Sequence, residues 1–440
     1  MRTRRLLAVA VLAASATTLR PRLALSEGAR VFTLAQAERA ARKQPQMLVA
    51  HSAFKVAQGQ ADQVKASFLP QVTATAQYTR ETGNLAPTPT QRNLGAGDGT
   101  SLTKSFDYWQ LQIGATQLIF DFGKTSGRYH AAENMALSQK AAERTTELDA
   151  VLAVRRAYFG ARAMKALVGV AKDTLDDQNR HLVQVHGFFQ VGTQPEIAVA
   201  QQEAAVANAE VLLINAQNNY DTARAQLNQA TGLMEGTDYD VTDDTLGPVS
   251  DEDLPFEALA AKAFAARPEL LTLDKQRRAE EDTIGSAKGG YGPTLSASAG
   301  ASAMGVALGG LTPNWYGSLL LTWPIFEGGL TAARVRTARA SLQGVSAQKA
   351  LEALQVRLDV DTARLAVRAA KASIGAAERA AASAEEQLRL AEQRYATGIG
   401  NIIELNDAQV ARTSAAAQVV QARYELESAR AELLAALGRT

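Results

Sequence analysis

Residues 394–407 read Arg394-Tyr-Ala-Thr-Gly-Ile-Gly-Asn-Ile-Ile-Glu-Leu-Asn-Asp407, a tight reversal between two long segments that have the pattern of helices. A shift of 206 positions places this stretch on Phe189-Gln-Val-Gly-Thr-Gln-Pro-Glu196. The same shift carries Phe120 onto Phe326 and Gly232 onto Gly438. Two similar halves more often build one pseudo-symmetric object than two separate domains. The sequence therefore predicts a duplicated unit whose two copies each bend back at this point.

Charge and cysteine content exclude several classes of protein. The chain of 440 residues has 46 Lys plus Arg against 45 Asp plus Glu, so no bulk charge indicates a nucleic-acid partner. It contains no cysteine. Disulfides, thiolate metal sites, a cysteine nucleophile and a lipid attached through an N-terminal cysteine are therefore excluded.

The N-terminus has the build of a signal peptide. A basic head at residues 1–5 is followed by a short apolar run at residues 6–14 and then by small residues. Possible cleavage sites are Ala14-Ser-Ala16 and Ala24-Leu-Ser26, so we expect about residues 1–26 to be removed. The run is far below the ~20 residues that a membrane anchor needs. No later apolar run is long enough for a membrane helix either, so any insertion must use strands.

The hydrophobic period changes in the same order in both halves. The first repeat (27–232) predicts a helix over residues 33–67, strands at about 70–82 and 106–120, a long helix at 124–188 and a return helix at 195–231. The second repeat (255–440) predicts helices at about 255–288 interrupted at Arg267-Pro268, strands at about 293–304 and 314–325, a long helix at 330–396 and a last helix at 402–437.

Two connections differ between the copies. Residues 233–254 contain many acids and no Lys or Arg, and we interpret them as a solvated acidic linker at the equator. Pro45 and Pro70 match Pro268 and Pro293 at 223 positions instead of 206, so the first copy holds 17 extra residues between its strands. That loop, at 83–104, is rich in Gly and Pro, and an insertion there indicates a solvent-facing end.

The strands alternate apolar and polar residues over lengths that suit a tilted membrane crossing of ~9–11 residues. Four strands cannot close a barrel, which needs at least ~8, so several chains must contribute. A polar inner face then predicts a water-filled pore, with aromatic residues at the membrane interfaces. The candidate interface anchors are Trp109, Trp315 and Trp323. The alternative is a soluble sandwich that packs these faces together.

The helices favour the wall of a tube. On the second long helix one stripe of leucines (351, 354, 358, 365) and one of valines (356, 360, 367) lie about 140° apart at ~100° per residue, which predicts neighbours on two sides. On the last helix alanine recurs every seven residues from Ala408 to Ala436, a spacing that lets helices approach closely. The return helix and the first helix of the next copy, placed end to end, would match one long helix in length.

With this architecture, the whole mature sequence resembles the TolC-like outer membrane efflux protein family. The resemblance rests on the duplicated helix-strand-strand-helix-helix unit and on the order of its short motifs. These are Leu69-Pro70 and Gly292-Pro293 before strands, Phe120-Asp-Phe-Gly and Phe326-Glu-Gly-Gly after strands, Arg394-Tyr-Ala-Thr-Gly398, and Leu405-Asn-Asp-Ala-Gln409.

The resemblance implies an α+β membrane protein that acts as a homotrimer. Three chains, with four strands each, would form a 12-stranded outer-membrane β-barrel in contact with outer-membrane lipid, continued by a long periplasmic α-helical barrel. It also implies a periplasmic adaptor (membrane fusion) protein and an inner-membrane pump of RND or ABC type as partners, and no cofactor. The hairpin ends would form the periplasmic aperture.

Family positions at that aperture map onto this chain residue by residue. The pore-lining acids correspond to Glu404 and Asp407, and a closing tyrosine corresponds to Tyr395. The hairpin turns, with the expected adaptor contact, are Gly192, Thr193, Gly398 and Gly400. Two partners differ, because the family's arginine is Gly400 here and its acidic partner is Ala198. Alternatively, both acids simply begin a helix and Tyr395 packs against the neighbouring hairpin.

Nothing in the sequence indicates an enzyme or a metal site. Nucleophile motifs, phosphate-binding glycine loops and acid–base pairs are absent from the sequence, and His51, His130, His181 and His186 lack the spacing of metal ligands. We therefore expect an exit duct, located in the outer membrane and reaching into the periplasm, for small molecules or proteins. The alternative is a non-conducting structural or adhesive protein, and the sequence identifies neither the cargo nor the pump.

Overall fold

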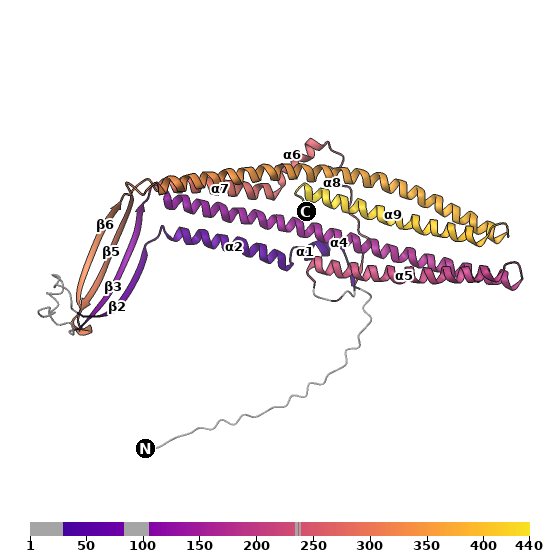
Figure 1. The fold of residues 1–440 in the computed structure, drawn as a ribbon, viewed down its shortest axis with the longest axis horizontal. Coiled ribbons are helices and arrows are strands. Elements are labelled where there is room, and N and C mark those ends of the chain that lie inside the picture. Colours follow the sequence, from indigo (N-terminus) through magenta and orange to yellow (C-terminus); the bar gives the residue numbers. More distant parts are fainter. Residues whose placement is uncertain (1–29, 83–104, 234–235, 237–238) are drawn as a thin grey trace, which may run out of the picture.

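The computed structural model describes residues 30–82, 105–233, 236 and 239–440. The predicted signal peptide and the long loop of the first copy therefore lie outside the described residues. A sheet occupies one end of the described chain and two helical hairpins end at the other (Figure 1). This arrangement places the two repeated turns side by side at the end farthest from the sheet.

Two helices run the length of the helical part. They are α4 (Lys124–Gln190) and α8 (Leu330–Ala396), with 67 residues each. At 1.5 Å per residue each is about 100 Å long. Neither contains a proline, so the backbone hydrogen bonds continue without interruption from the sheet end to the turn.

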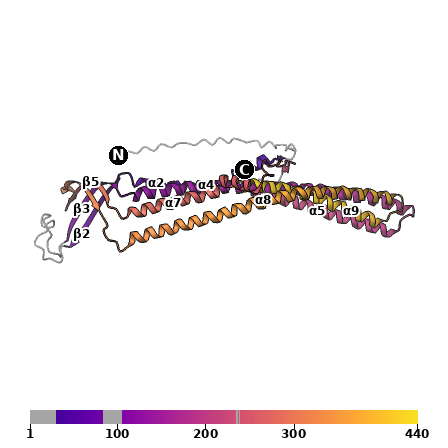
Figure 2. The ribbon, with the colours of Figure 1, turned by 90° about the horizontal axis from the view of Figure 1, so that it is seen from above.

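Shorter helices flank these two. In the sheet half, α2 (Pro45–Ala66) packs on α4, and α7 (Pro268–Gly289) packs between α4 and α8. In the hairpin half, α5 (Glu196–Thr231) packs on α4, and α9 (Ile402–Ala436) packs between α4 and α8. Figures 1 and 2 show the sheet-half helices fanned out as one bent layer. The layer is a wall with two open sides rather than a closed bundle.

Each return helix stacks end to end on the sheet-half helix of its own copy, α5 on α2 and α9 on α7. A Cβ atom at Gly232, after α5, would lie 3.0 Å from Gln44 Cβ, just before α2. A Cβ atom at Gly438, after α9, would lie 2.9 Å from the carbonyl carbon of Ala266, just before α7. The expectation that α5 stacks on the first helix of the next copy was therefore wrong. α2 and α7 have the same length, so length cannot decide which of them continues α5.

Proline divides the first helix of each copy. The segment expected as one helix over residues 33–67 is α1 (Leu34–Ala41) followed by α2, and the second copy has α6 (Phe256–Ala266) followed by α7. Pro45 and Pro268 each stand in the first turn of the second helix, where a missing N–H costs no hydrogen bond. Both interruptions lie near the middle of the molecule.

The acidic segment between the copies is only in part the solvated linker expected from its charge, since Asp243 and Asp253 are exposed but other residues are packed. Its strand β4 (Tyr239–Val241) pairs in parallel with β1 (Arg30–Phe32). Glu252 is only 5% exposed and forms ion pairs with Lys371 of α8 and Arg430 of α9. The basic partners lie more than 100 residues away, so a local reading of the sequence did not reveal them.

Four antiparallel strands form the sheet in the order β2-β3-β5-β6. They are β2 (Gln71–Thr82), β3 (Ser105–Phe120), β5 (Thr294–Gly305) and β6 (Thr312–Thr322), with the short 3-10 turn η1 (Leu308–Gly310) between the last two. Within this sheet, β2 and β6 are edge strands. Because β6 ends at Thr322, Trp323 lies just beyond it, and its Nε1 donates to the Tyr291 carbonyl at 3.1 Å.

The two faces of the sheet have different chemistry. One face shows polar rows across all four strands, for example Thr75, Gln112, Ser302 and Asn314. The other shows apolar rows, for example Ala74, Ile113, Ala301 and Trp315. The alternation predicted from the sequence is therefore confirmed across the paired strands.

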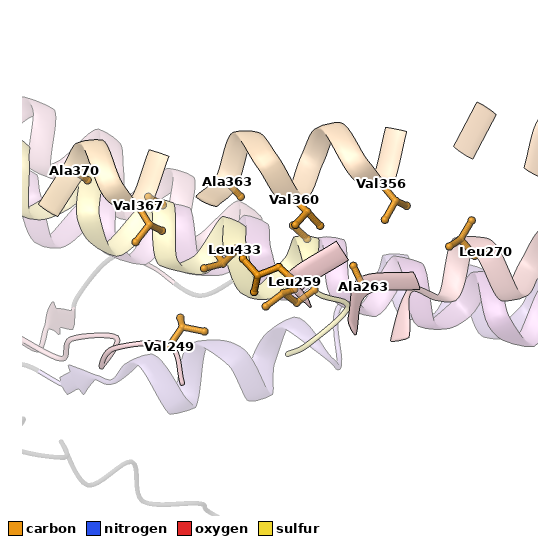
Figure 3. Close-up of a cluster of buried hydrophobic side chains, with 13 residues drawn as sticks. Val249, Leu259, Ala263, Leu270, Val356, Val360, Ala363, Val367, Ala370 and Leu433 are labelled. Carbon is orange, nitrogen blue, oxygen red and sulfur yellow. The ribbon is translucent and has the colours of Figure 1, made fainter. Parts of the chain in front are cut away.

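A cluster of buried side chains joins α6, α7, α8 and α9 near the middle of the molecule (Figure 3). The valine stripe of α8 lies in this cluster, whereas the four leucines of the other stripe are exposed. Ala408, Ala415, Ala422, Ala429 and Ala436 of α9 are all buried. One predicted neighbour is thus present within the chain, and the leucine stripe has none among the described residues.

By length and composition, α5 is the one helix in the described part of the chain that could cross a membrane. The sequence reading, which found no such segment, missed it. The Gln202 side chain of α5 is fully buried and donates to the Gln178 carbonyl of α4 at 3.0 Å. This buried polar contact packs α5 on α4.

Candidate functional site

The two hairpin turns have the same backbone geometry. Gly192 has φ 77° and Gly398 has φ 76°, the left-handed region that glycine adopts without strain. In the first turn the Thr193 N–H and hydroxyl both donate to the Phe188 carbonyl at 2.9 Å. In the second the N–H of Gly400 donates to the Arg394 carbonyl at 2.8 Å. The repeated sequence therefore forms a repeated C-terminal cap that reverses the chain.

An apolar cluster holds the two hairpin ends together. It consists of residues from α4, α5, α8 and α9: Val185, Ala198, Val199, Leu388, Ala391, Tyr395, Ile402, Leu405 and Ala408. Tyr395 is 1% exposed, and its ring packs edge-on against Phe188 at 5.7 Å between centroids. Its hydroxyl has no hydrogen-bond partner among the described residues. Tyr395 thus joins the hairpins by packing.

The two acids of the second turn have different surroundings. The N–H of Glu404 donates to the side chain of Asn401, which caps α9, at 2.8 Å. The Glu404 carboxylate forms an ion pair with Arg394 Nε at 3.0 Å, across the turn. Asp407 is exposed, and no ion pair to it is found within the described ranges. The geometry brings Arg394 and Glu404 together and leaves Asp407 as the open carboxylate.

The departures from the family pattern have a packing reason. A Cβ atom at Gly400 would lie 3.0 Å from both Arg394 Cβ and Tyr395 N, so this turn has little room for a larger residue. Ala198 is 2% exposed inside the apolar cluster, where a carboxylate would be buried. A larger residue at Gly400 would require its neighbours to shift, and a carboxylate at position 198 would lose its hydration.

A buried polar layer, absent from the sequence-based list of site residues, lies next to the cluster. Asp177 of α4 accepts hydrogen bonds from Gln409 Nε2 and Arg412 Nη1 of α9, both at 3.2 Å. His181, one turn further along α4, lies with Nε2 3.6 Å from Glu392 Oε1 of α8. Burial lowers the pKa of His181, against the opposing effect of Glu392. The layer connects the two hairpins. It could not be predicted from the sequence, because its residues come together only when α4 packs against α9.

An open groove of about 660 Å³ runs between α5 and α9 over α4. Its lining combines amides such as Asn208 and Asn406 with small and aliphatic side chains such as Ala205 and Val410. No charged residue lines it. Gln409 of the polar layer also lines this groove, so the two features adjoin.

The three tryptophans lie toward both ends of the sheet. Trp109 pairs with Tyr78 at 4.7 Å between ring centroids, and Trp315 is 81% exposed on the apolar face. Trp109 and Trp315 stand toward the end that carries the loops, whereas Trp323 stands where the helices begin. Within the described residues, no group of three His, Asp or Glu side chains could hold a metal ion.

A profile of the outer membrane efflux protein family matches residues 37–233 and 259–439. The toluene efflux pump outer membrane protein TtgC of Pseudomonas putida is 25% identical over 391 residues, which is 85% of this chain and 76% of that protein. The fusaric acid resistance protein FusA of Burkholderia cepacia is 25% identical over 306 residues. That alignment covers 65% of this chain and 54% of FusA.

Solved outer-membrane channels share the fold. The outer membrane protein VceC of Vibrio cholerae superposes with a TM-score of 0.79 at 19% identity, over 92% of this chain and 96% of that one. The open state of the MtrE channel of Neisseria gonorrhoeae superposes with a TM-score of 0.74 at 19% identity, over 92% and 89% of the two chains.

Proposed function

The chain belongs to the outer membrane efflux protein family and is an exit duct of the outer membrane, and on that premise we propose that three copies build the duct. Each copy would contribute its four strands to one 12-stranded barrel, with β6 of one copy paired to β2 of the next. The helical layers would close in the same way into a tunnel through the periplasm.

The two open edges of the sheet are the observation that carries this proposal. Unpaired backbone groups at β2 and β6 would each cost several kcal/mol in lipid. Closure removes both edges, places the apolar rows against lipid and turns the polar rows toward a water-filled lumen. The tryptophans at the two ends of the sheet fit two membrane interfaces.

The hairpin ends would form the periplasmic mouth. In this proposal Asp407 and the Glu404–Arg394 pair surround the opening, and the packing of Tyr395 on Phe188 holds the hairpins together. The turns at Gly192, Thr193, Gly398 and Gly400 would meet a periplasmic adaptor, which connects the duct to an inner-membrane pump of RND or ABC type. Relatives named for toluene efflux and fusaric acid resistance support small organic molecules as cargo.

Single-channel recording in planar bilayers tests the proposal. We expect the purified trimer to conduct rarely, because the mouth is packed shut, and to conduct more when this packing is weakened by Tyr395→Ala. A matched control is Tyr291→Ala, which changes an exposed tyrosine at the opposite end of the helices. A trimer that never conducts in either form would overturn the duct and favour a structural protein.

A further inference from the structure

One polar row of the sheet is unlike its neighbours. Thr73, Gly114, Gly300 and Tyr316 face one another across the four strands. The adjacent rows on the same face carry side chains at every position, for example Gln71, Thr116, Ser298 and Ser318. Two facing glycines in the middle of a sheet weaken it, so their presence here calls for a physical reason.

The ring of Tyr316 covers both glycines. A Cβ atom at Gly300 would lie 2.8 Å from Tyr316 Oη and 2.9 Å from its Cε1. A Cβ atom at Gly114, one strand further, would lie 2.7 Å from the same hydroxyl. Gln112 Nε2 donates to this hydroxyl at 3.1 Å. The side chain therefore starts on β6, crosses β5 and ends on β3, parallel to the surface of the sheet.

Aromatic side chains laid over glycines in a neighbouring strand compensate for the missing side-chain packing. The arrangement also prevents the ring from standing upright. If either glycine carried a side chain, the phenol could not occupy its present place and would have to turn away from the sheet. The two glycines thus form a recess, defined here as the space over Gly114 and Gly300 that the ring fills.

We propose that this recess holds Tyr316 flat against the inner wall of the barrel, so that Tyr316 sets the width of the lumen at this level. The inference rests on the proposed barrel, in which the polar face is the inner one. Threefold symmetry would place three Tyr316 rings at one height, each exposing one aromatic face and one hydroxyl to passing cargo. Tyr316 is then a specificity-determining residue that contacts amphipathic molecules in transit.

The two glycines differ in what they would disturb. At Gly300 a Cβ atom would also lie 2.5 Å from the carbonyl oxygen of Ile113, so substitution there would strain the strand pairing. At Gly114 the only close contact is the tip of Tyr316, since the next neighbour, Ala299 O, is 3.9 Å away. Gly114→Ala therefore displaces the ring and little else. Gly317, next to Tyr316, has nothing within 4 Å and supplies the control Gly317→Ala.

Polymer exclusion measures the width of the barrel from its outer side. Neutral polyethylene glycols of increasing size, added on that side only, lower the conductance until they are too large to enter. We expect Gly114→Ala to shift this cut-off to smaller polymers and Gly317→Ala to leave it unchanged. Gly114→Ala combined with Tyr316→Ala should move the cut-off at least back to the wild-type size. An unchanged cut-off in Gly114→Ala, or a shift that persists without Tyr316, would overturn the inference.

A second readout does not depend on conduction. Fluorotyrosine incorporated into the trimer gives a ¹⁹F signal for Tyr316, assigned by its loss in Tyr316→Phe. Broadening of this signal by a water-soluble paramagnetic agent should increase in Gly114→Ala and not in Gly317→Ala. If neither the wild-type trimer nor Tyr395→Ala ever conducts, the proposed duct fails. If the trimer conducts and Gly114→Ala changes neither the cut-off nor the broadening, the recess alone fails.

Discussion

At the scale of single residues, the ion pair with Arg394 makes Glu404 electrostatically different from Asp407, the other acid at the hairpin end. A carboxylate already paired at 3.0 Å attracts passing cations less than an open one. We therefore expect Asp407→Asn to reduce cation selectivity more than Glu404→Gln does. Reversal potentials across a salt gradient measure this difference. A larger shift for Glu404→Gln would show that the pair does not persist in the working trimer.

His181 gives the hairpin packing a dependence on pH. Burial lowers its pKa below the ordinary value of 6.5, and the charged groups facing it are Glu392 of α8 and Asp177 and Arg180 of α4. A lowered pKa means that the unfolded chain binds a proton first as the pH falls. Stability contributed by neutral His181 is therefore complete above pH 6.5 and is lost as the pH falls below that value.

We expect the melting temperature of the trimer to fall between pH 7.5 and pH 5.5, and to fall less in His181→Gln. His130→Gln changes an exposed histidine and is the control. Equal losses in wild type, His130→Gln and His181→Gln would assign the pH dependence to other groups.

Residue identities in the turns could be predicted from the sequence, but their neighbours could not. The repeated glycines located both turns, and the structure places Gly192 and Gly398 in the conformation that only glycine adopts easily. The reason for Gly400 and Ala198 could not be seen, because it depends on how close Arg394 and the apolar cluster approach. Likewise, nothing near Asp177 in the sequence indicates Gln409 and Arg412 as its partners.

At the scale of elements, the alanines of α9 set the distance between helices. Ala422 is 3% exposed in the middle of the seven-residue repeat. Extra methylene groups in a packed site cost about 1–3 kcal/mol. We expect Ala422→Leu to lower the stability of the trimer by about this amount and Gln418→Leu, an exposed site on the same helix, to change it little. Denaturant unfolding followed by circular dichroism measures both, and equal effects would refute close packing at Ala422.

The acidic segment contributes stability through Glu252. Burial raises the pKa of this carboxyl, but the bonds from Lys371 and Arg430 outweigh it and hold the pKa below 4.5. Stability from a lowered pKa is present above the unfolded value and is lost as the pH falls through the folded one.

Replacing Glu252 by Gln removes a charged partner from both bases, so we expect a loss of about 2–3 kcal/mol at neutral pH. The difference between the variant and the wild type should begin to narrow below pH 4.5 and disappear only below the folded pKa of Glu252. Denaturant unfolding at pH 7 and pH 4 measures this. Glu257→Gln, whose side chain is 75% exposed in its pair with Arg357, is the control. A constant difference at both pH values would contradict the assigned role.

Element types followed from the sequence because periodicity is local, whereas stacking and pairing are not. The long helices and all four strands were visible as periods of about 3.6 and 2. The choice of α2 as the partner of α5 depends on the contact between Gly232 and Gln44, nearly 190 residues apart. The burial of Glu252 could not be predicted for the same reason, since its partners belong to remote helices.

At the scale of the whole molecule, closure of the sheet determines which helices meet between copies. In the proposed barrel, pairing of β6 with β2 of the next copy would bring α8, which follows β6, beside α2, which precedes β2. Leu351 stands 21 residues from the start of α8 and Leu48 stands 18 residues from the end of α2. At 1.5 Å per residue these are about 32 and 27 Å from the sheet, and both side chains are exposed in one copy.

The chain has no cysteine, so pairs of cysteines can test this directly. We expect Leu48→Cys with Leu351→Cys to form disulfides between copies on mild oxidation, seen as bands of two and three chains in denaturing gels. Leu48→Cys with Lys349→Cys is the control, since Lys349 faces α7 through its bond to Asp274. Crosslinking of the control pair alone would contradict the pairing of β6 with β2 of the next copy.

The interruptions at the equator have a mechanical consequence. Each copy has four helical columns. Two of them, α4 and α8, are single helices that pass the equator unbroken. The other two, α2 with α5 and α7 with α9, are pairs of helices that meet end to end at that level. A continuous rod of about 100 Å acts as a lever with arms of about 50 Å, so a tilt of only about 10° displaces its tip by ~9 Å. The two-helix columns can follow such a tilt by sliding where their helices meet. Tilting of α4 and α8 can therefore move the hairpin ends apart while every hydrogen bond within the helices stays in place.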